Sequence, residues 1–421
     1  MTQVFEPLVK MYSGLAGMPH HHITFVPQPI SRVPASRCHE YIMGNDPVTG
    51  RPVIDEIVES LTAPLTDEQR QTGISERSAT RYIGPDTEDN LLNYFTENRM
   101  TDGLPIVLPT EERVAEMLKC TSHPADEVVG DVRSAYEGWS ITVEKVAANA
   151  VMTGARPEYL PVILAMAASG VSGISSSTTS FTTLTVVNGP MRNEIGMNAG
   201  CGAMSPFNRA NSVIGRVYTL LSLNGGGGRP CETYWGSQGN PMDFSHATFA
   251  ENEEELPEGW QPFHVQKGYK PEESVISFFR GWGIWHWKNT YEYDKHKAIL
   301  QMSNWMGANG GYCLLLDPIV ADDLVREGFP TKESVSEYVY KNNKLTLGEF
   351  WQYHLIENSR RDANKGIEPY ATWLKQPKDT LITRYRSQEA ISLFVVGGRA
   401  NDFWQAGDWH HLGSYSIDEW R

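Results

Sequence analysis

The sequence predicts an α/β protein built from two α/β halves with mainly parallel sheets around an inter-domain cleft, plus an extended N-terminal arm. Short apolar runs alternate with helical segments in the first half of the chain, and the alternation resumes near the C-terminus. A turn-rich, aromatic stretch separates these two regions. The length of 421 residues is also enough for two hydrophobic cores.

Residues 1–50 are rich in proline, glycine and histidine and have no sustained hydrophobic period. We expect them to form an extended arm that packs on the body of the protein or on a neighbouring subunit. Helical periodicity begins after Pro52 and returns over about 87–99. Both segments are expected to be amphipathic surface helices.

The first α/β domain is expected to span residues 51–230. Its apolar runs predict strands and its periodic segments predict helices. Thr110 as an N-cap and Pro157 at a first helical position mark the starts of two of these helices. The expected strands are 104–108, 127–132 and 184–187, and the expected helices are 110–119, 142–152, 157–169 and 207–224.

Residues 231–290 form the turn-rich aromatic excursion, with short strands expected at 244–250 and 275–279. The second α/β domain is expected over 291–421. Its expected strands are 312–316 and 391–396, and its expected helices are 297–305, 318–328, 331–340 and 346–358. Two such halves would leave a cleft, and clefts at the carboxyl ends of strands bind small molecules.

Composition narrows the function classes. The 36 Lys+Arg against 51 Asp+Glu give a formal net charge of -15, which disfavours nucleic acid and anionic membrane surfaces as partners. Five scattered cysteines without a C-x-x-C pair indicate a reducing compartment, and the N-terminus has no signal-peptide pattern. We therefore expect a cytoplasmic protein. Its 12 Trp and 18 Tyr, many in polar surroundings, indicate subunit contacts and hence a homo-oligomer.

The stretch from Val186 to Arg229 is the expected functional centre. A buried strand there leads into a loop rich in glycine, asparagine and arginine, and a helix follows. Glycines expose backbone N–H groups, and a helix N-terminus favours anions, so an anionic group of a small polar metabolite is the expected ligand. The candidate substrate-binding residues, including a second glycine turn after the last strand, are Asn188, Arg192, Asn198, Asn208, Arg209, Asn211, Arg216, Gly397 and Gly398.

Two residues of this stretch are candidates for catalysis. Glu194 follows Arg192 closely and is suited to acid/base work. Cys201 lies between Gly200 and Gly202 near a positive helix end, which favours a reactive thiolate. The competing interpretations are a packing role for the lone cysteine and a structural carboxylate partner for Arg216.

No cofactor is predicted. Gly225 to Gly228 follow a helix instead of opening one, and the G-x-G at Gly200 lacks the third glycine of a dinucleotide fingerprint. The histidines lack the spacing that places two metal ligands on one helix face. A metal site is therefore left open only through residues far apart in sequence, such as His246, Glu251 and His264.

Several segments resemble a poorly characterised bacterial family described by its link to a UGSC motif, selenocysteine-Gly-Ser-Cys. These segments are DGLPIVLPTEERVAEML, ITVEKVAANAVMTGARPEYLPVILAM, VVNGPMRNEIGMNAGCGAMSPFNRANSVIGR and LFVVGG. The resemblance lies mainly within residues 102–230 and implies a redox or thiol-linked enzyme. The present chain has no C-G-S-C sequence, so a partner chain would have to supply a dithiol for redox chemistry.

Three functions remain from the sequence. The first is an enzyme of lyase or hydrolase type, which acts on a small polar, anionic metabolite by acid/base or addition-elimination chemistry. The second is a thiol-dependent oxidoreductase component that uses Cys201 together with a partner protein subunit. The third is a non-catalytic scaffold subunit of a larger assembly.

Overall fold

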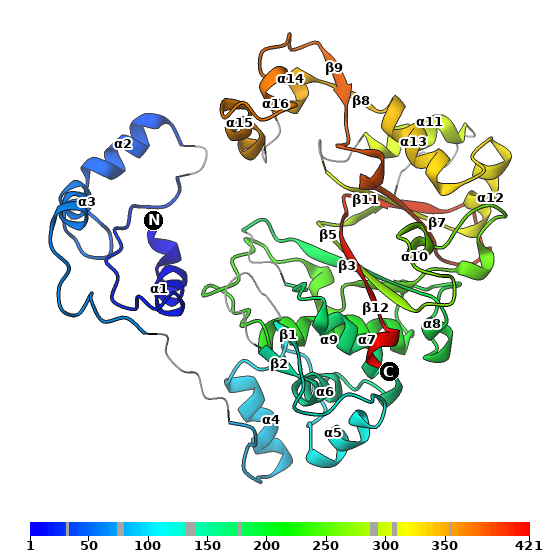
Figure 1. Cartoon of the computed structure of the whole chain (residues 1–421), viewed down its shortest axis with the longest axis horizontal. Coiled ribbons are helices and arrows are strands. Elements are labelled where there is room, and N and C mark those ends of the chain that lie inside the picture. The colour runs from blue at the N-terminus through cyan, green and yellow to red at the C-terminus, as the bar shows by residue number, and fades with distance from the viewer. Residues whose placement is uncertain are drawn as a thin grey trace.

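The computed structural model describes residues 1–30, 33–73, 80–131, 140–174, 178–286, 294–304, 310–352 and 356–421 (Figure 1). The protein is a mixed α/β structure with two four-stranded sheets. Its strands are β1 Val128–Asp131, β2 Ser140–Thr142, β3 Thr182–Asn188, β4 Ala247–Ala250, β5 Val275–Gly281, β6 Ile284–His286, β7 Tyr312–Leu316, β8 Lys344–Thr346, β9 Leu381–Thr383, β10 Ile391–Val395, β11 Trp404–Gly407 and β12 His410–Ser416.

The helices of the first half are α1 Glu6–Leu15, α2 Ala35–Met43, α3 Val53–Thr62, α4 Glu88–Glu97, α5 Glu111–Leu118, α6 Val143–Met152, α7 Leu160–Ala168, α8 Met191–Glu194 and α9 Arg209–Asn224. Those of the second half are α10 Phe263–Gln266, α11 Lys295–Ser303, α12 Pro318–Arg326, α13 Lys332–Asn342, α14 Leu347–Phe350, α15 Glu357–Asn364 and α16 Tyr370–Trp373. Among the described residues, no helix combines the length and apolar character needed to cross a membrane.

The prediction of mainly parallel sheets is wrong. The first sheet has the order β12-β5-β3-β4 and the second β10-β7-β11-β6. Only β3–β4 and β10–β7 pair in parallel within these sheets, and the remaining neighbours are antiparallel. The sequence conceals this because antiparallel strands buried on both faces read as continuous apolar runs, as parallel strands do.

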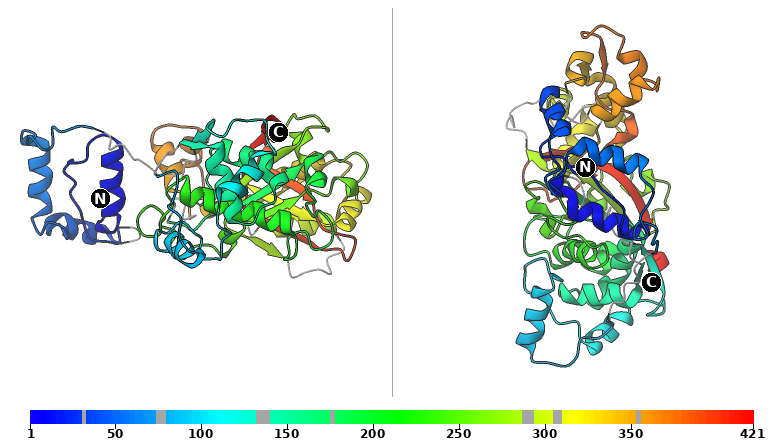
Figure 2. Two further views of the ribbon diagram at one scale, coloured as in Figure 1. Left: turned by 90° about the horizontal axis from the view of Figure 1, so that it is seen from below. Right: turned by 90° about the vertical axis from the view of Figure 1, so that its left-hand side faces the viewer.

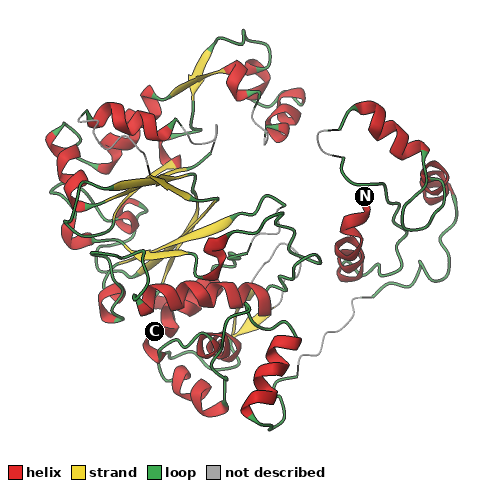
Figure 3. Cartoon of the chain, turned by 180° about the vertical axis from the view of Figure 1, so that it is seen from behind, coloured by secondary structure: helices red, strands yellow, loops and turns green. Residues whose placement is uncertain are grey.

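The two sheets face each other across a shared core. Alternate residues of each strand point to opposite faces, so Leu184 and Leu315 enter this shared core together with Phe394. The opposite face of each sheet packs against helices. Residues on the outer face of the first sheet contact α6, α7 and α9, and those of the second sheet contact α11, α12 and α13. Figure 3 shows the strands of both sheets between groups of helices. A packed core thus fills the space between the facing sheets.

Strands also cross the expected boundaries. β5 occupies an interior position of the first sheet although it lies in the segment expected to be turn-rich, and β12 from the C-terminal region pairs with it. The run 104–108, predicted as a strand, lies outside any strand. Its Val107 N–H instead donates to the Met152 carbonyl at the end of α6, 3.0 Å away.

The N-terminal arm, predicted to be extended, contains helices. It contains α1 and α2, and α2 packs against α3. Figure 2 shows these three helices next to one another. The Phe5 ring makes an edge contact with Trp235, with ring centroids 4.9 Å apart.

Candidate functional site

A pocket of about 390 Å³ opens where β7 and β10 end. These two strands are parallel, so their carboxyl ends lie at the same edge of the second sheet. The pocket is lined by the ends of both strands, the segment after each, the start of β11, and the loop between α8 and α9. Its lining residues are Cys201, Gly202, Ala203, Met204, Ser205, Leu315, Asp317, Val396, Gly397, Gly398, Ala400, Asn401, Phe403 and Gln405.

The double-glycine turn after β10 touches the loop that carries Cys201. A Cβ atom on Gly398 would lie 3.0 Å from the Cβ of Cys201 and 3.1 Å from its backbone nitrogen. Gly397 has φ of 103°, which side chains disfavour, and its N–H donates to the Ala199 carbonyl at 2.8 Å. The structure therefore brings together three predicted site residues, Cys201, Gly397 and Gly398.

Three predicted ligand-binding asparagines instead brace this loop. The Asn198 amide donates to the Cys201 carbonyl at 2.9 Å and to Asn208 Oδ1 at 2.8 Å. Asn208 donates in turn to the carbonyls of Gly202, Ala203 and Ser205. Asn211 donates to Asn198 and Ala203 and accepts from the Asn198 N–H. These bonds satisfy the carbonyls of an irregular segment and fix the backbone beside Cys201.

Cys201 is exposed at this pocket. Burial raises the pKa of the Cys313 and Cys120 thiols, which disfavours their thiolate forms. Cys231 is also exposed, but it does not line this pocket. The sequence identified Cys201 by its position between two glycines near the start of a helix.

Asp317 is a pocket residue that the sequence analysis missed. It follows β7 directly and caps α12, with Oδ1 accepting from the Val320 N–H at 2.9 Å. Its Oδ2 accepts from the Phe403 N–H at 2.7 Å. Burial raises the pKa of Asp317, and these backbone bonds oppose the rise. An acidic residue directly after an apolar strand was the available signal.

Glu194 lies on α8 and forms an ion pair with the C-terminal residue. Its Oε2 and Oε1 accept from Arg421 Nη1 and Nη2 at 2.8 and 3.0 Å. Neither residue lines the pocket at Cys201. The structure therefore does not bring the two catalytic candidates, Glu194 and Cys201, into one pocket.

The three candidate arginines bind separate protein groups. Arg192 is buried and pairs with Glu254 through two hydrogen bonds of 2.8 and 2.9 Å. The hydrogen bond from Arg192 lowers the pKa of Glu254 to about 2. Arg216 forms a two-bond pair with Asp102, the structural alternative considered from the sequence. Arg209 donates to the Gly154 carbonyl at 2.9 Å.

Asn188, the last residue of β3, belongs to a buried polar network that reaches the turn after β10. Its amide donates to Glu251 and Glu253, each at 2.8 Å. Glu251 is fully buried and pairs with Lys332 Nζ at 2.5 Å, so its carboxylate is committed to protein partners. Next to it, Asn252 donates to the Gly397 carbonyl at 2.9 Å. This network therefore supports the turn that contacts Cys201.

A second polar cluster lies near the starts of β3 and β4. His246 is buried, its Nδ1 and Nε2 lie 2.6 and 3.1 Å from the hydroxyls of Thr183 and Thr219, and burial lowers its pKa to about 3. Burial raises the pKa of neighbouring Asp243 to about 7. Burial therefore keeps His246 uncharged at neutral pH, and its two hydroxyl contacts give it a structural role.

Comparison with known proteins finds no matching family model, no matching curated protein and no matching solved structure. The resemblance to the UGSC-linked family therefore stays a prediction from the sequence segments.

Proposed function

We propose that this protein is a thiol-dependent enzyme that binds a small molecule in the pocket at Cys201. The observation that carries the proposal is the exposed Cys201 thiol, held on a braced loop in a pocket of about 390 Å³ at the carboxyl ends of β7 and β10. Volumes of this size suit small-molecule ligands. The carboxyl ends of parallel strands are also the usual ligand position in α/β sheets.

The lining indicates the kind of substrate. Met204, Leu315, Val396 and Phe403 provide apolar surface. The polar side chains Asp317, Asn401 and Gln405 supply a few hydrogen-bonding groups. No candidate arginine lines this pocket. We therefore propose a substrate with an apolar body and one or two polar groups in place of the small polar, anionic metabolite expected from the sequence.

The proposed reaction is addition followed by elimination at Cys201. The thiolate lone pair forms an S–C bond to an electrophilic carbon of the substrate, such as a carbonyl carbon. The π electron pair of the C=O bond moves to oxygen, which takes up a proton. Loss of that proton and return of the electron pair expel a leaving group from the carbon and leave a thioester on Cys201. Water then adds to the thioester carbon and the thiolate leaves, which frees the acid product and restores Cys201, so no external oxidant or reductant is required. Asp317 is the carboxyl group of the pocket proposed to exchange this proton.

Competitive thiol labelling tests the proposal. Folded protein is treated with substoichiometric iodoacetamide at neutral pH, and the modified cysteines are located by mass spectrometry. We expect Cys201 to be labelled at least tenfold faster than Cys231, because both are exposed but only Cys201 lines the pocket. Equal labelling of the two thiols would count against a reactive Cys201.

A small electrophile library then tests the pocket itself. Aldehydes and α,β-unsaturated carbonyl compounds with short apolar chains should protect Cys201 from iodoacetamide and leave Cys231 unprotected. Cys201→Ser should retain the thermal transition of the native protein and lose covalent adduct formation. Adducts that persist on the Cys201→Ser protein would place the chemistry elsewhere.

A further inference from the structure

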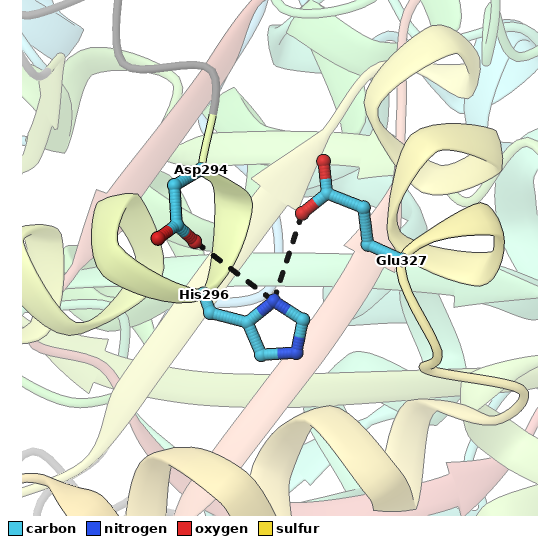
Figure 4. A group of neighbouring side chains, drawn as sticks. All are labelled: Asp294, His296 and Glu327. Carbon is cyan, nitrogen blue, oxygen red and sulfur yellow. Dashed lines mark ion pairs between the residues drawn. The ribbon is translucent and has the colours of Figure 1, made fainter.

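A separate group of side chains joins two helices of the second half. Asp294 is the N-cap residue of α11, His296 lies in its first turn, and Glu327 is the C-cap residue of α12. Figure 4 shows both carboxylates directed toward the same nitrogen of His296. His296 Nδ1 lies 3.9 Å from Asp294 Oδ1 and 3.6 Å from Glu327 Oε2. None of the three lines the pocket at Cys201.

The three side chains are held by their surroundings. Asp294 Oδ1 accepts from the Lys297 N–H at 3.1 Å, and Glu327 Oε2 accepts from the Lys295 N–H at 3.1 Å. The His296 ring packs on Phe329 with centroids 4.5 Å apart and makes an edge contact with Tyr338 at 5.1 Å. Aromatic packing thus orients the imidazole, and backbone bonds orient the carboxylates.

Three atoms of kinds that bind metal ions lie close together in this arrangement. Both N···O separations exceed the 3.5 Å limit of a hydrogen bond, so a proton on Nδ1 would be poorly bonded to either carboxylate. Without that proton, an imidazole lone pair would face two negative oxygens. The three ligand atoms lie within 4.8 Å of one another. Around a zinc ion with bonds of about 2.0 Å, tetrahedral ligand atoms lie about 3.3 Å apart, so side-chain rotations that bring the atoms closer by at most about 1.5 Å would close the site.

We propose that Asp294, His296 and Glu327 bind a first-row divalent metal ion, with Zn²⁺ as the preferred ion. One imidazole nitrogen and two carboxylate oxygens form a ligand set typical of Zn²⁺, whereas Mg²⁺ and Ca²⁺ prefer oxygen ligands alone. Two carboxylates with a neutral imidazole also balance the charge of a divalent ion. The bound metal would fasten the start of α11 to the end of α12 and leave a coordination position for water.

Zn²⁺ titration of the metal-free full chain in competition with a chromophoric chelator tests the site. Three variants preserve the local packing. His296→Phe keeps an aromatic ring between Phe329 and Tyr338, Asp294→Asn keeps an N-cap acceptor, and Glu327→Gln keeps the side-chain length. We expect each variant to weaken Zn²⁺ binding at least tenfold while the circular dichroism spectrum stays that of the unmodified protein.

Controls separate this site from the other possible metal ligands of the chain. Replacement of His20, His21 and His22 by serine should leave the Zn²⁺ affinity unchanged. Co²⁺ substituted for Zn²⁺ should give a spectrum without thiolate-to-metal charge-transfer bands, since no cysteine belongs to the site. Unchanged affinity in His296→Phe, loss of binding in the triple serine variant, or thiolate bands with Co²⁺ would each overturn the proposal.

Discussion

The close approach of Gly398 to Cys201 is one of the contacts that fix the Cys201 loop against the double-glycine turn. Gly398→Ala would place a Cβ 3.0 Å from the Cβ of Cys201, closer than such atoms normally approach, so one of the two turns must shift. We expect the rate of iodoacetamide labelling of Cys201 in this variant to differ at least threefold from the rate in the unmodified protein. The rate is measured by time-resolved mass spectrometry of the folded protein.

Gly200 provides the matched control for this prediction. A Cβ on Gly200 meets only Asn198 Oδ1, at 3.7 Å, which is ordinary van der Waals contact. Gly200→Ala should therefore label Cys201 at the rate of the unmodified protein. If both glycine variants react alike, the contact with Gly398 does not set the position of the loop.

At the scale of elements, the buried ion pair between Lys332 and Glu251 joins the start of α13 to the end of β4. Lys332→Met would leave the Glu251 carboxylate without its cation in a site closed to water, at a cost of about 3–5 kcal/mol in the free energy of unfolding. Urea denaturation followed by tryptophan fluorescence measures this cost.

The double variant Lys332→Met with Glu251→Gln separates charge from packing. Glutamine removes the uncompensated negative charge and still accepts hydrogen bonds from the Phe263 N–H and the Asn188 amide. The double variant should recover at least half of the stability lost by Lys332→Met alone. A double variant that is as unstable as the single one would show that the lysine contributes through packing.

Individual helices and strands could be predicted from the sequence far better than the pairing of these elements with one another. β3, β7, β10 and α9 follow from apolar runs and helical periodicity, which are local signals. β11 and β12 were missed because WQAG and HHLGSYS contain polar residues, histidine and glycine, and their strand pairing depends on distant chain segments. Pairings such as Arg216 with Asp102, which are 114 positions apart, leave no local pattern. Cys201, Gly397 and Gly398 were identified as separate features, but only the fold shows that they meet.

For the whole molecule, buried Asp243 predicts an unusual dependence of stability on pH. Its pKa of about 7 in the folded protein lies above the value of 3.8 expected when unfolded, so the folded state holds a proton that the unfolded state has released. The stabilisation is complete below about pH 4 and is lost as the pH rises through 7. His246 has the opposite effect. Because its pKa is lowered to about 3 in the folded protein, its contribution to stability is complete above pH 6.5 and decreases as the pH falls.

Asp243→Asn isolates the contribution of this carboxyl group, because asparagine is uncharged at every pH. The stability of the unmodified protein relative to Asp243→Asn should fall between pH 4 and pH 7, by at most about 1.4 kcal/mol for each pH unit. Urea denaturation of both proteins in buffers of equal ionic strength gives this difference. His246 is present in both proteins, so its opposing contribution cancels to first order. A difference that stays constant across this range, or that grows with pH, would mean that Asp243 is already ionised at pH 4 in the folded protein.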